Sequence, residues 1–285
     1  MAASPAARRR VAVRVEGVVQ GVGFRPFVFR LAHELGVAGW VRNDEHGVLA
    51  EVEGPADAVE AFVTRLRADA PPLAEVGRVA CQERAVRDET GFAIVASVVA
   101  DPGALPSAPI TADSATCADC LAELSDPADR RYRYPFVNCT NCGPRFTIVR
   151  GVPYDRALTT MAAFTMCAAC RAEYDDPLDR RFHAQPNACP VCGPAVALLD
   201  RDGRELAADG SPSERGSPRL DDRLSRYGPH RPTDRHDPVR AAADALLAGR
   251  IVAVKGLGGY HLACRADDES AVAALRARKH REDRP

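Results

Sequence analysis

Four Cys-x-x-Cys pairs lie in the middle of this 285-residue chain. A turn of this kind places two thiolates on one edge of a tetrahedral Zn²⁺, and a second turn completes the coordination. Four thiolates leave no open coordination position, so the pattern predicts two structural zinc sites. Buried free thiols and a redox pair are the alternatives. The predicted ligands are Cys117, Cys120, Cys139, Cys142, Cys167, Cys170, Cys189 and Cys192.

The cysteine region is an internal duplication. Within each half 18 residues separate the two pairs, and every cysteine recurs 50 residues later. The likeness extends further, because residues 120–131 match residues 170–181 and both halves carry Cys-Gly-Pro at their last cysteine. The duplication favours one site within 117–142 and the other within 167–192. An intertwined pairing is the alternative.

A second candidate site is the glycine-rich stretch at residues 19–25, Val-Gln-Gly-Val-Gly-Phe-Arg. A loop between a strand and a helix can point successive backbone N–H groups at an anion, assisted by the helix N-terminus. Arg25 at its end is suited to bind phosphate oxygens with two hydrogen bonds. The spacing matches neither the dinucleotide fingerprint nor the Walker loop. A tight turn followed by a surface arginine is the alternative.

The elements that must position this loop follow a βαββαβ order. Apolar and polar residues alternate at 11–16, and apolar residues at helical spacing follow at 26–35. This order is the split βαβ, or ferredoxin-like, α+β arrangement. The remaining predicted elements are strands at 37–41 and 48–52, a helix that begins at Pro55, and strands at 76–81 and 92–95.

Composition divides the chain into five segments. One of them, the connector at 199–236, is rich in Asp, Arg, Gly, Ser and Pro, a composition that predicts disorder. The last segment combines a helix that ends at Gly249, a strand at 251–254, a glycine-rich turn and a helix at 269–278, and we expect an α/β domain that is incomplete at Pro285. The predicted segments are a first domain at 1–96, a linker at 97–112, the cysteine region at 113–198, the connector at 199–236 and the α/β segment at 237–285.

The bulk composition is that of an ordinary globular protein. A formal net charge of -1 and a pI of about 6.7 give no electrostatic reason to expect nucleic acid or an anionic membrane as the main partner. No apolar run reaches the roughly 18 residues of a spanning helix, and no signal-peptide run follows the charged start. We therefore expect a cytoplasmic location with reduced thiols. Cys81 and Cys264 are expected to be buried, and the aromatics of residues 130–136 to form core rather than stack on a base.

The amino-acid sequence of the glycine loop and of the residues around it resembles that of the acylphosphatase family. Residues 15–26 read Val-Glu-Gly-Val-Val-Gln-Gly-Val-Gly-Phe-Arg-Pro, followed by Gly-Trp-Val-Arg-Asn at 39–43 and Gly-Val at 47–48. The resemblance implies that Arg25 holds a phosphoryl group and that Asn43 orients the attacking water. It also implies that loop amides bind the phosphoryl group, those of Gln20, Gly21, Val22, Gly23 and Phe24. Without it, Asn43 is a turn residue, and His33 and His46 are surface histidines in either case.

The combination of segments resembles the HypF family of hydrogenase maturation carbamoyltransferases. The motifs are the duplicated cysteine pairs, residues 131–139, residues 179–186 and the glycine-rich tail at 255–264. The resemblance implies that carbamoyl phosphate is hydrolysed at the first domain. Carbamate then reacts with ATP at a YrdC-like domain to give carbamoyl-adenylate. A further domain passes the carbamoyl group to the C-terminal cysteine of a partner of the HypE type, as the precursor of a cyanide ligand of the [NiFe] centre.

The tail of the chain carries the nucleotide expectation. By the resemblance, Lys255, Lys279 and Arg281 contact the nucleotide, and solvated surface charges are the alternative. Because the chain stops at Pro285, we expect the first step and the zinc sites but not the full ATP-dependent transfer. Two other functions stay open: a general acylphosphatase with a zinc appendage, and a non-catalytic zinc-ribbon module that binds nucleic acid or protein.

Overall fold

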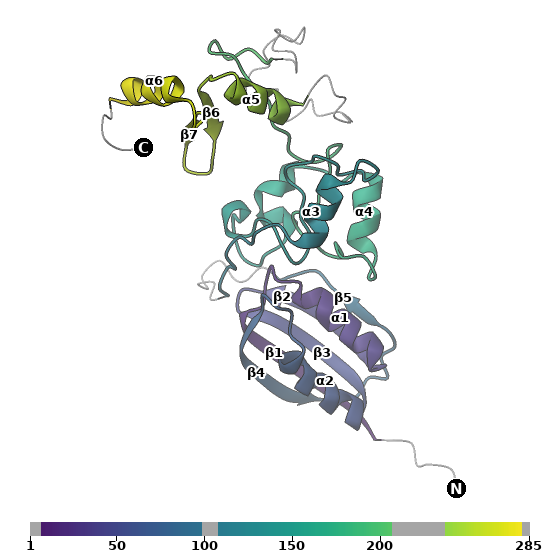
Figure 1. Ribbon diagram of the computed structural model, residues 1–285. Helices are drawn as coiled ribbons and strands as arrows, with labels where there is room; N and C mark the ends of the chain where they lie inside the picture. The colour runs from purple at the N-terminus through teal and green to yellow at the C-terminus, as the bar shows by residue number, and fades with distance from the viewer. Residues whose placement is uncertain (1–6, 99–107, 207–236, 281–285) are drawn as a thin grey trace. The chain divides into compact units, whose positions relative to one another are not determined.

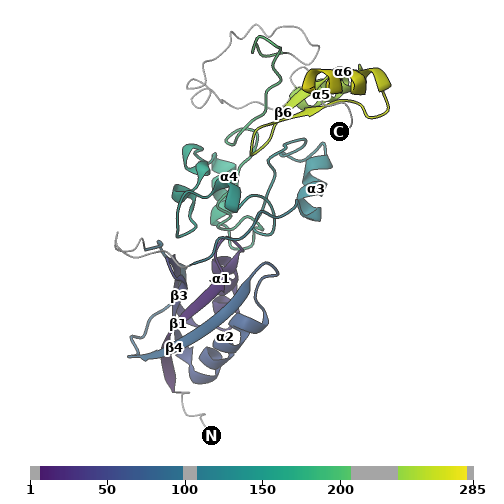
Figure 2. The same ribbon diagram turned by 90° about the vertical axis from the view of Figure 1, so that its left-hand side faces the viewer.

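A computed structural model describes residues 7–98, 108–206 and 237–280 of the chain. The chain forms two compact units, residues 1–193 and 194–285. The first unit contains the βαββαβ domain and the cysteine region, and the second contains the glycine-rich tail. Two views at right angles show the elements (Figures 1 and 2).

A five-stranded sheet forms the first domain, in the order β4-β1-β3-β2-β5. Neighbouring strands are antiparallel, except that β2 and β5 are parallel. β3 lies between β1 and β2, so the chain crosses one strand in the split βαβ manner. This order confirms the predicted ferredoxin-like α+β class, with β5 added at the edge. The strands are β1 (Arg8–Val18), β2 (Ala38–Asp44), β3 (Gly47–Pro55), β4 (Glu75–Arg84) and β5 (Phe92–Ile94).

Two helices, α1 (Phe24–Glu34) and α2 (Ala56–Ala68), cover one face of this sheet (Figures 1 and 2). Val11, Val13 and Val15 of β1 lie in the core under them and are at most 1% exposed. The period of two places Arg10 on the opposite face, where it pairs with Glu53 at 3.1 Å. The alternation seen in the sequence therefore separates an apolar core from a buried ion pair.

The cysteine region folds as two similar halves. Helices α3 (Ala118–Ser125) and α4 (Ala168–Asp175) each begin directly after the first cysteine of a pair and carry the second. Each of these helices has only eight residues, too few for a helical periodicity to show in the sequence. Short 3₁₀ turns lie between the halves: η1 (Phe146–Ile148), η2 (Arg156–Leu158) and η3 (Thr160–Ala163).

The second unit carries two helices and a hairpin: α5 (Pro238–Leu247), β6 (Val252–Lys255), β7 (Tyr260–Ala263) and α6 (Glu269–Lys279). Asp237 caps α5 through the amides of Val239 and Arg240, which explains where the helix starts. The sequence does not predict β7. The glycine turn closes a hairpin, with the Gly256 amide donating to the Gly259 carbonyl at 2.7 Å.

Residues 199–206, which composition places in the connector, form a turn with a bridge between Leu199 and Glu205. The rest of the predicted connector, 207–236, lies outside the described residues. Within the described ranges, no helix is long and apolar enough to cross a membrane.

The prediction that Cys81 is buried is wrong, since Cys81 is exposed and Cys264 is partly exposed. Cys81 lies on β4, an edge strand, whereas α2 packs over β1 and β3. The aromatic run at 130–136 forms core only in part. Tyr134 is 3% exposed and packs among the cysteines, while Tyr132 and Phe136 remain partly in solvent.

Candidate active site and metal centres

The glycine loop between β1 and α1 forms an open cradle of backbone donors. Gly21 and Gly23 have φ of 73° and 76°, a left-handed conformation that glycine adopts without strain. Within the described part of the chain, the amides of Gly21, Val22 and Gly23 donate no hydrogen bond. They stand at the N-terminus of α1, where the helix dipole favours negative charge. The loop therefore has the geometry of an anion site.

Arg25 lies in the first turn of α1 and is 8% exposed. One of its terminal nitrogens, Nη1, donates to the Ser97 hydroxyl at 3.2 Å. The other, Nη2, lies 2.7 Å from a carboxylate oxygen of Asp155 and 3.5 Å from the Tyr154 carbonyl. The buried guanidinium is thus held in place from two sides, beside the loop amides.

Asn43 stands at the end of β2, paired with Val48 of β3, and is 1% exposed. Its side-chain oxygen is buried and accepts no hydrogen bond from the described residues. A buried acceptor without a donor costs about 1–3 kcal/mol, so the position calls for a bound water or ligand. Asn43 lines the same pocket as Arg25 and the glycine loop.

Gln20 connects this turn to the loop. Its side-chain nitrogen donates to the carbonyls of Asp44 and Gly47, at 2.6 and 2.9 Å. Its side-chain oxygen accepts from the Tyr154 amide at 2.8 Å. Gln20 therefore holds the Asn43 turn, the loop and the cysteine region together.

The opposite wall of the pocket comes from the cysteine region, which the sequence did not place there. The wall consists of Thr140, Arg145, Tyr154, His183, Ala184, Gln185 and Pro186. A Cβ built on Gly21 would lie 3.2 Å from the Arg145 side chain and 3.4 Å from the Tyr154 ring, so the two parts are in close contact. The anion site is therefore enclosed between the first domain and the cysteine region.

Arg145 joins the cysteine region to the glycine loop and is 2% exposed. Its guanidinium donates to carbonyls of the metal-binding turn, those of Cys139, Thr140, Cys142 and Pro144, at 2.8–3.2 Å. Its Nε donates to the carbonyl of Gly21 in the anion loop. One signal could have found Arg145: Cys142-Gly-Pro-Arg145 becomes Cys192-Gly-Pro-Ala195 in the second half, a break in the duplication.

His183 lines the pocket with its ring against Tyr174 and Phe182, at centroid distances of 4.9 and 4.7 Å. Burial, followed by the positive charge of Arg25, lowers the pKa of His183 to about 4. The ring is therefore neutral near pH 7. It gives the pocket a wall that can donate or accept a hydrogen bond without adding charge.

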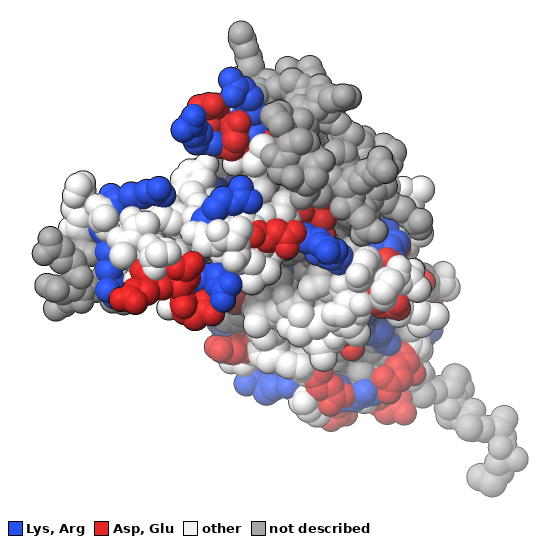
Figure 3. Space-filling model, turned by 45° about the horizontal axis from the view of Figure 1, so that its top comes forward, with Lys and Arg blue, Asp and Glu red and all other residues white. Residues whose placement is uncertain are grey.

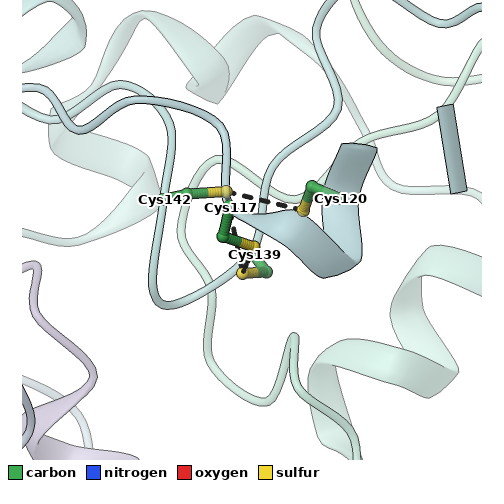
Figure 4. A group of neighbouring side chains, drawn as sticks. All are labelled: Cys117, Cys120, Cys139 and Cys142. Atoms are coloured by element: carbon green, nitrogen blue, oxygen red, sulfur yellow. Dashed lines mark hydrogen bonds between the residues drawn. The ribbon is translucent and has the colours of Figure 1, made fainter. Parts of the chain in front are cut away.

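The predicted cysteine ligands converge into two clusters, each with its sulfur atoms within 4.8 Å of one another. Figure 4 shows the side chains of the first cluster pointing toward a common centre. Neighbouring Sγ atoms are 3.5–3.8 Å apart in both clusters. Tetrahedral zinc with Zn–S bonds of about 2.3 Å requires about 3.8 Å. The clusters fit zinc, and each forms within one half, so the grouping is sequential: Cys117/Cys120/Cys139/Cys142 and Cys167/Cys170/Cys189/Cys192.

A pair of arginines in each half forms ion pairs with a glutamate of the other half. Arg130 and Arg131 of the first half bind Glu173 of the second, and Arg180 and Arg181 bind Glu123 in the equivalent way. Two of these arginines also contact sulfur atoms of the opposite cluster. Arg130 lies 3.3 Å from Cys170 Sγ, and Arg180 lies 3.1 Å from Cys120 Sγ. A metal with four thiolates carries excess negative charge, and each half supplies cations that offset the charge of the other.

Three family models match the chain: Acylphosphatase over residues 11–94, HypF finger over 116–149 and 166–199, and Telomere recombination, of the Sua5/YrdC type, over 244–285. The carbamoyltransferase HypF2 of Cupriavidus necator is 53% identical over 277 residues, which are 97% of this chain and 31% of that protein. The carbamoyltransferase HypF of Synechocystis is 46% identical over a similar span, 97% of this chain and 32% of that protein. The chain belongs to the HypF family. It covers the N-terminal portion, about a third of the length of these relatives.

Solved HypF structures agree with this assignment. A full-length HypF in a phosphate- and nucleotide-bound form matches 100% of this chain and 33% of that chain, with a TM-score of 0.80 and 41% identity. HypF of T. kodakarensis matches 97% of this chain and 31% of that chain, with a TM-score of 0.75 and 43% identity. The acylphosphatase of Bifidobacterium longum is 49% identical over 80 residues, 28% of this chain and 81% of that protein. The first domain of this HypF chain is therefore an acylphosphatase domain.

Two of the predicted nucleotide contacts of this HypF chain lie at the ends of separate elements. Lys255 ends β6, with its ammonium 5.4 Å from the Tyr260 ring centre, and Lys279 ends α6. Arg281 lies outside the described residues.

On the face drawn in Figure 3, basic and acidic side chains are interspersed. Among the described residues of that face no extended surface of one charge forms.

Proposed function

We propose that this chain hydrolyses carbamoyl phosphate to carbamate and phosphate, as the first step of a HypF carbamoyltransferase. The observation that carries the proposal is one pocket that combines open loop amides, a buried arginine and a buried unpaired asparagine oxygen. These groups meet the three needs of acyl phosphate hydrolysis: an anion cradle, charge stabilisation and a positioned water.

In the proposed mechanism, the amides of residues 20–24 and Arg25 hold the phosphoryl oxygens. The oxygen of Asn43 accepts a hydrogen bond from a water and aims it at phosphorus. A P–O bond forms to this water while the P–O bond to the carbamoyl group breaks, so the electron pair leaves with carbamate and the water proton with phosphate. Carbamate is a stable leaving group, so positioning and charge stabilisation supply the rate without a strong base.

The later steps belong to the rest of the proposed enzyme. Carbamate reacts with ATP at the YrdC-like domain, and the carbamoyl group passes to a C-terminal cysteine of a HypE-type partner. Lys255, Lys279 and Arg281 remain proposed nucleotide contacts. We also propose that Zn²⁺ occupies both cysteine clusters, where four thiolates would give it a structural role.

Phosphate release from carbamoyl phosphate tests the first step, corrected for the spontaneous decay of the substrate. We expect Arg25→Ala and Asn43→Ala each to lower kcat/KM by roughly 100-fold or more, the usual effect of removing one group that stabilises the transition state. Arg30→Ala is the matched control, because Arg30 lies on the same helix but is exposed. It should keep full activity.

The outcomes separate the alternatives. Equal rates with carbamoyl phosphate and bulky acyl phosphates would favour a general acylphosphatase. An inactive but folded chain that binds RNA or DNA with a steep salt dependence would favour the zinc-ribbon module. Unchanged rates in both site variants would remove the glycine loop from the mechanism.

A further inference from the structure

The carboxylate of Asp155 lies beside the anion site, next to the pocket-lining Tyr154, although Asp155 is not itself among the residues that line the pocket. It lies 2.7 Å from the arginine proposed to grip the phosphoryl group, and its side chain is only 25% exposed. A negative charge at this position weakens the binding of a phosphate by direct repulsion. Such a group persists in a binding site when it forms an interaction that outweighs this cost.

The placement of Asp155 leaves part of the carboxylate available. One oxygen binds Nη2 of Arg25, and the other accepts no hydrogen bond from the residues that the structure describes. The Tyr154 carbonyl lies 3.5 Å from the same nitrogen, so two acceptors meet at this side of Arg25. The loop residues Gly21 and Gly23, whose amides are open donors, line the pocket and form the donor side of the site. Asp155 and the Tyr154 carbonyl form an acceptor side next to Arg25.

The acyl part of the substrate extends from the donor side. The loop and Asn43 take the phosphoryl group and the water, and an in-line displacement places the leaving group opposite the water. Asp155 and the phosphoryl group share one guanidinium, so the width of that group separates them. The carbamoyl group carries an NH₂ group, which is a hydrogen-bond donor and is compatible with an acceptor at this position.

We propose that Asp155 is the residue that selects carbamoyl phosphate, by accepting a hydrogen bond from its amino group. This inference rests on the proposed hydrolysis and adds its specificity determinant. Acetyl phosphate has nearly the same shape but carries a methyl group there, which leaves the carboxylate without its donor. A site built around a substrate N–H discriminates strongly against an analogue that lacks it.

The test compares kcat/KM for carbamoyl phosphate and acetyl phosphate in the unaltered chain, Asp155→Ala and the control Asp175→Ala. Asp175 is an exposed carboxylate at the end of α4 in the same region. We expect the unaltered chain to prefer carbamoyl phosphate and the control to keep this preference. Asp155→Ala should reduce the ratio by roughly 10- to 100-fold, the effect of a hydrogen bond to a charged group.

Other results overturn the inference. An equal fall with both substrates means that Asp155 only orients Arg25, and an equal rise means that it only repels anions. No preference in the unaltered chain refutes the selection and leaves hydrolysis standing.

Binding decides the case in which the chain hydrolyses neither substrate, which would refute the proposed hydrolysis itself. Calorimetry would then compare phosphonoacetamide with 2-oxopropylphosphonate, stable analogues that differ in the same NH₂ and CH₃ groups. Tighter binding of the amide, lost in Asp155→Ala, would support the selection. Equal affinities would refute it.

Discussion

At the scale of single residues, the charged groups of the pocket are set by the side chains next to them. Arg25 lies beside the loop, and Asp155 contacts it directly. His183 lies near the same charge in a partly buried position, and burial together with Arg25 lowers its pKa to about 4. His183 belongs to the motif at residues 179–186, but the proximity of His183 to Arg25 depends on the fold.

The protonation of His183 gives a prediction. Its folded pKa lies below the unfolded value of about 6.5, so the stability from the neutral ring is complete above pH 6.5 and is lost as pH falls toward 4. At pH 5.5 an ordinary imidazole is about nine-tenths protonated, whereas we expect His183 to stay neutral in NMR spectra of the imidazole. Arg25→Gln should raise its pKa by removing the positive charge.

Arg30→Gln is the control for this titration and should leave the His183 pKa unchanged. The metal content must be measured at the same pH, because protons compete with metal for cysteine. Titration of His183 near pH 6.5 in the unaltered chain would contradict the buried position.

At the scale of elements, the metal-binding turn of the first half and the glycine loop are joined through Arg145. The peptide group is planar, so the hydrogen bond from Arg145 to the Gly21 carbonyl also fixes the direction of the Val22 N–H. The loop amides are free of other partners in the described structure, so this contact decides their aim. A structural metal site thereby shapes an anion site.

Arg145→Ala should weaken the binding of inorganic phosphate by roughly 10-fold or more while both metals remain bound. The reason is that the loop loses its support and several buried carbonyls lose a donor, each at about 1–3 kcal/mol. Calorimetry with phosphate and a metal assay would measure the two effects. Arg150→Ala, which changes an exposed arginine of the same segment, is the control. Normal phosphate affinity in a folded Arg145→Ala variant would show that the loop is rigid by itself.

At the scale of the whole first unit, two kinds of core stabilise the parts. The sheet domain buries a continuous apolar cluster under α1 and α2. The cysteine region has a small core of seven buried residues, three of which are cysteines of the first cluster. Arginines of each half also contact the cysteine ligands of the other half. The folding of the cysteine region should therefore depend on metal, and each half should need the other half in order to stay folded.

Removal of metal tests this dependence. Chelation should unfold residues 113–195 and leave the sheet domain folded, because metal binding energy is folding energy there. Both metal equivalents should leave in one transition, since unfolding one half removes the arginines that support the other. A colorimetric metal titration, circular dichroism and limited proteolysis would follow these events. Protease resistance of the cysteine region after chelation, or two separate release steps, would contradict the prediction.

The sequence by itself determined the local chemistry of this protein. The period-two alternation at 11–16, the glycines at 21 and 23 and the cysteine spacing each restrict the backbone or the ligand geometry within a few residues. The order of elements then predicted the sheet. The βαββαβ order, Arg25 and Asn43 in one pocket, and the two cysteine clusters could therefore all be anticipated.

The tertiary structure alone decided which residues of the cysteine region complete the pocket. Arg145 and His183, which line the pocket, and Asp155, which contacts Arg25, lie more than 100 residues from the glycine loop, and no periodicity relates them to it. Their contacts arise from packing between two folded parts, which depends on the shapes of both surfaces. For the same reason the sequence did not reveal the exposure of Cys81 or the arginine contacts between the two halves, since both depend on which neighbours the fold supplies.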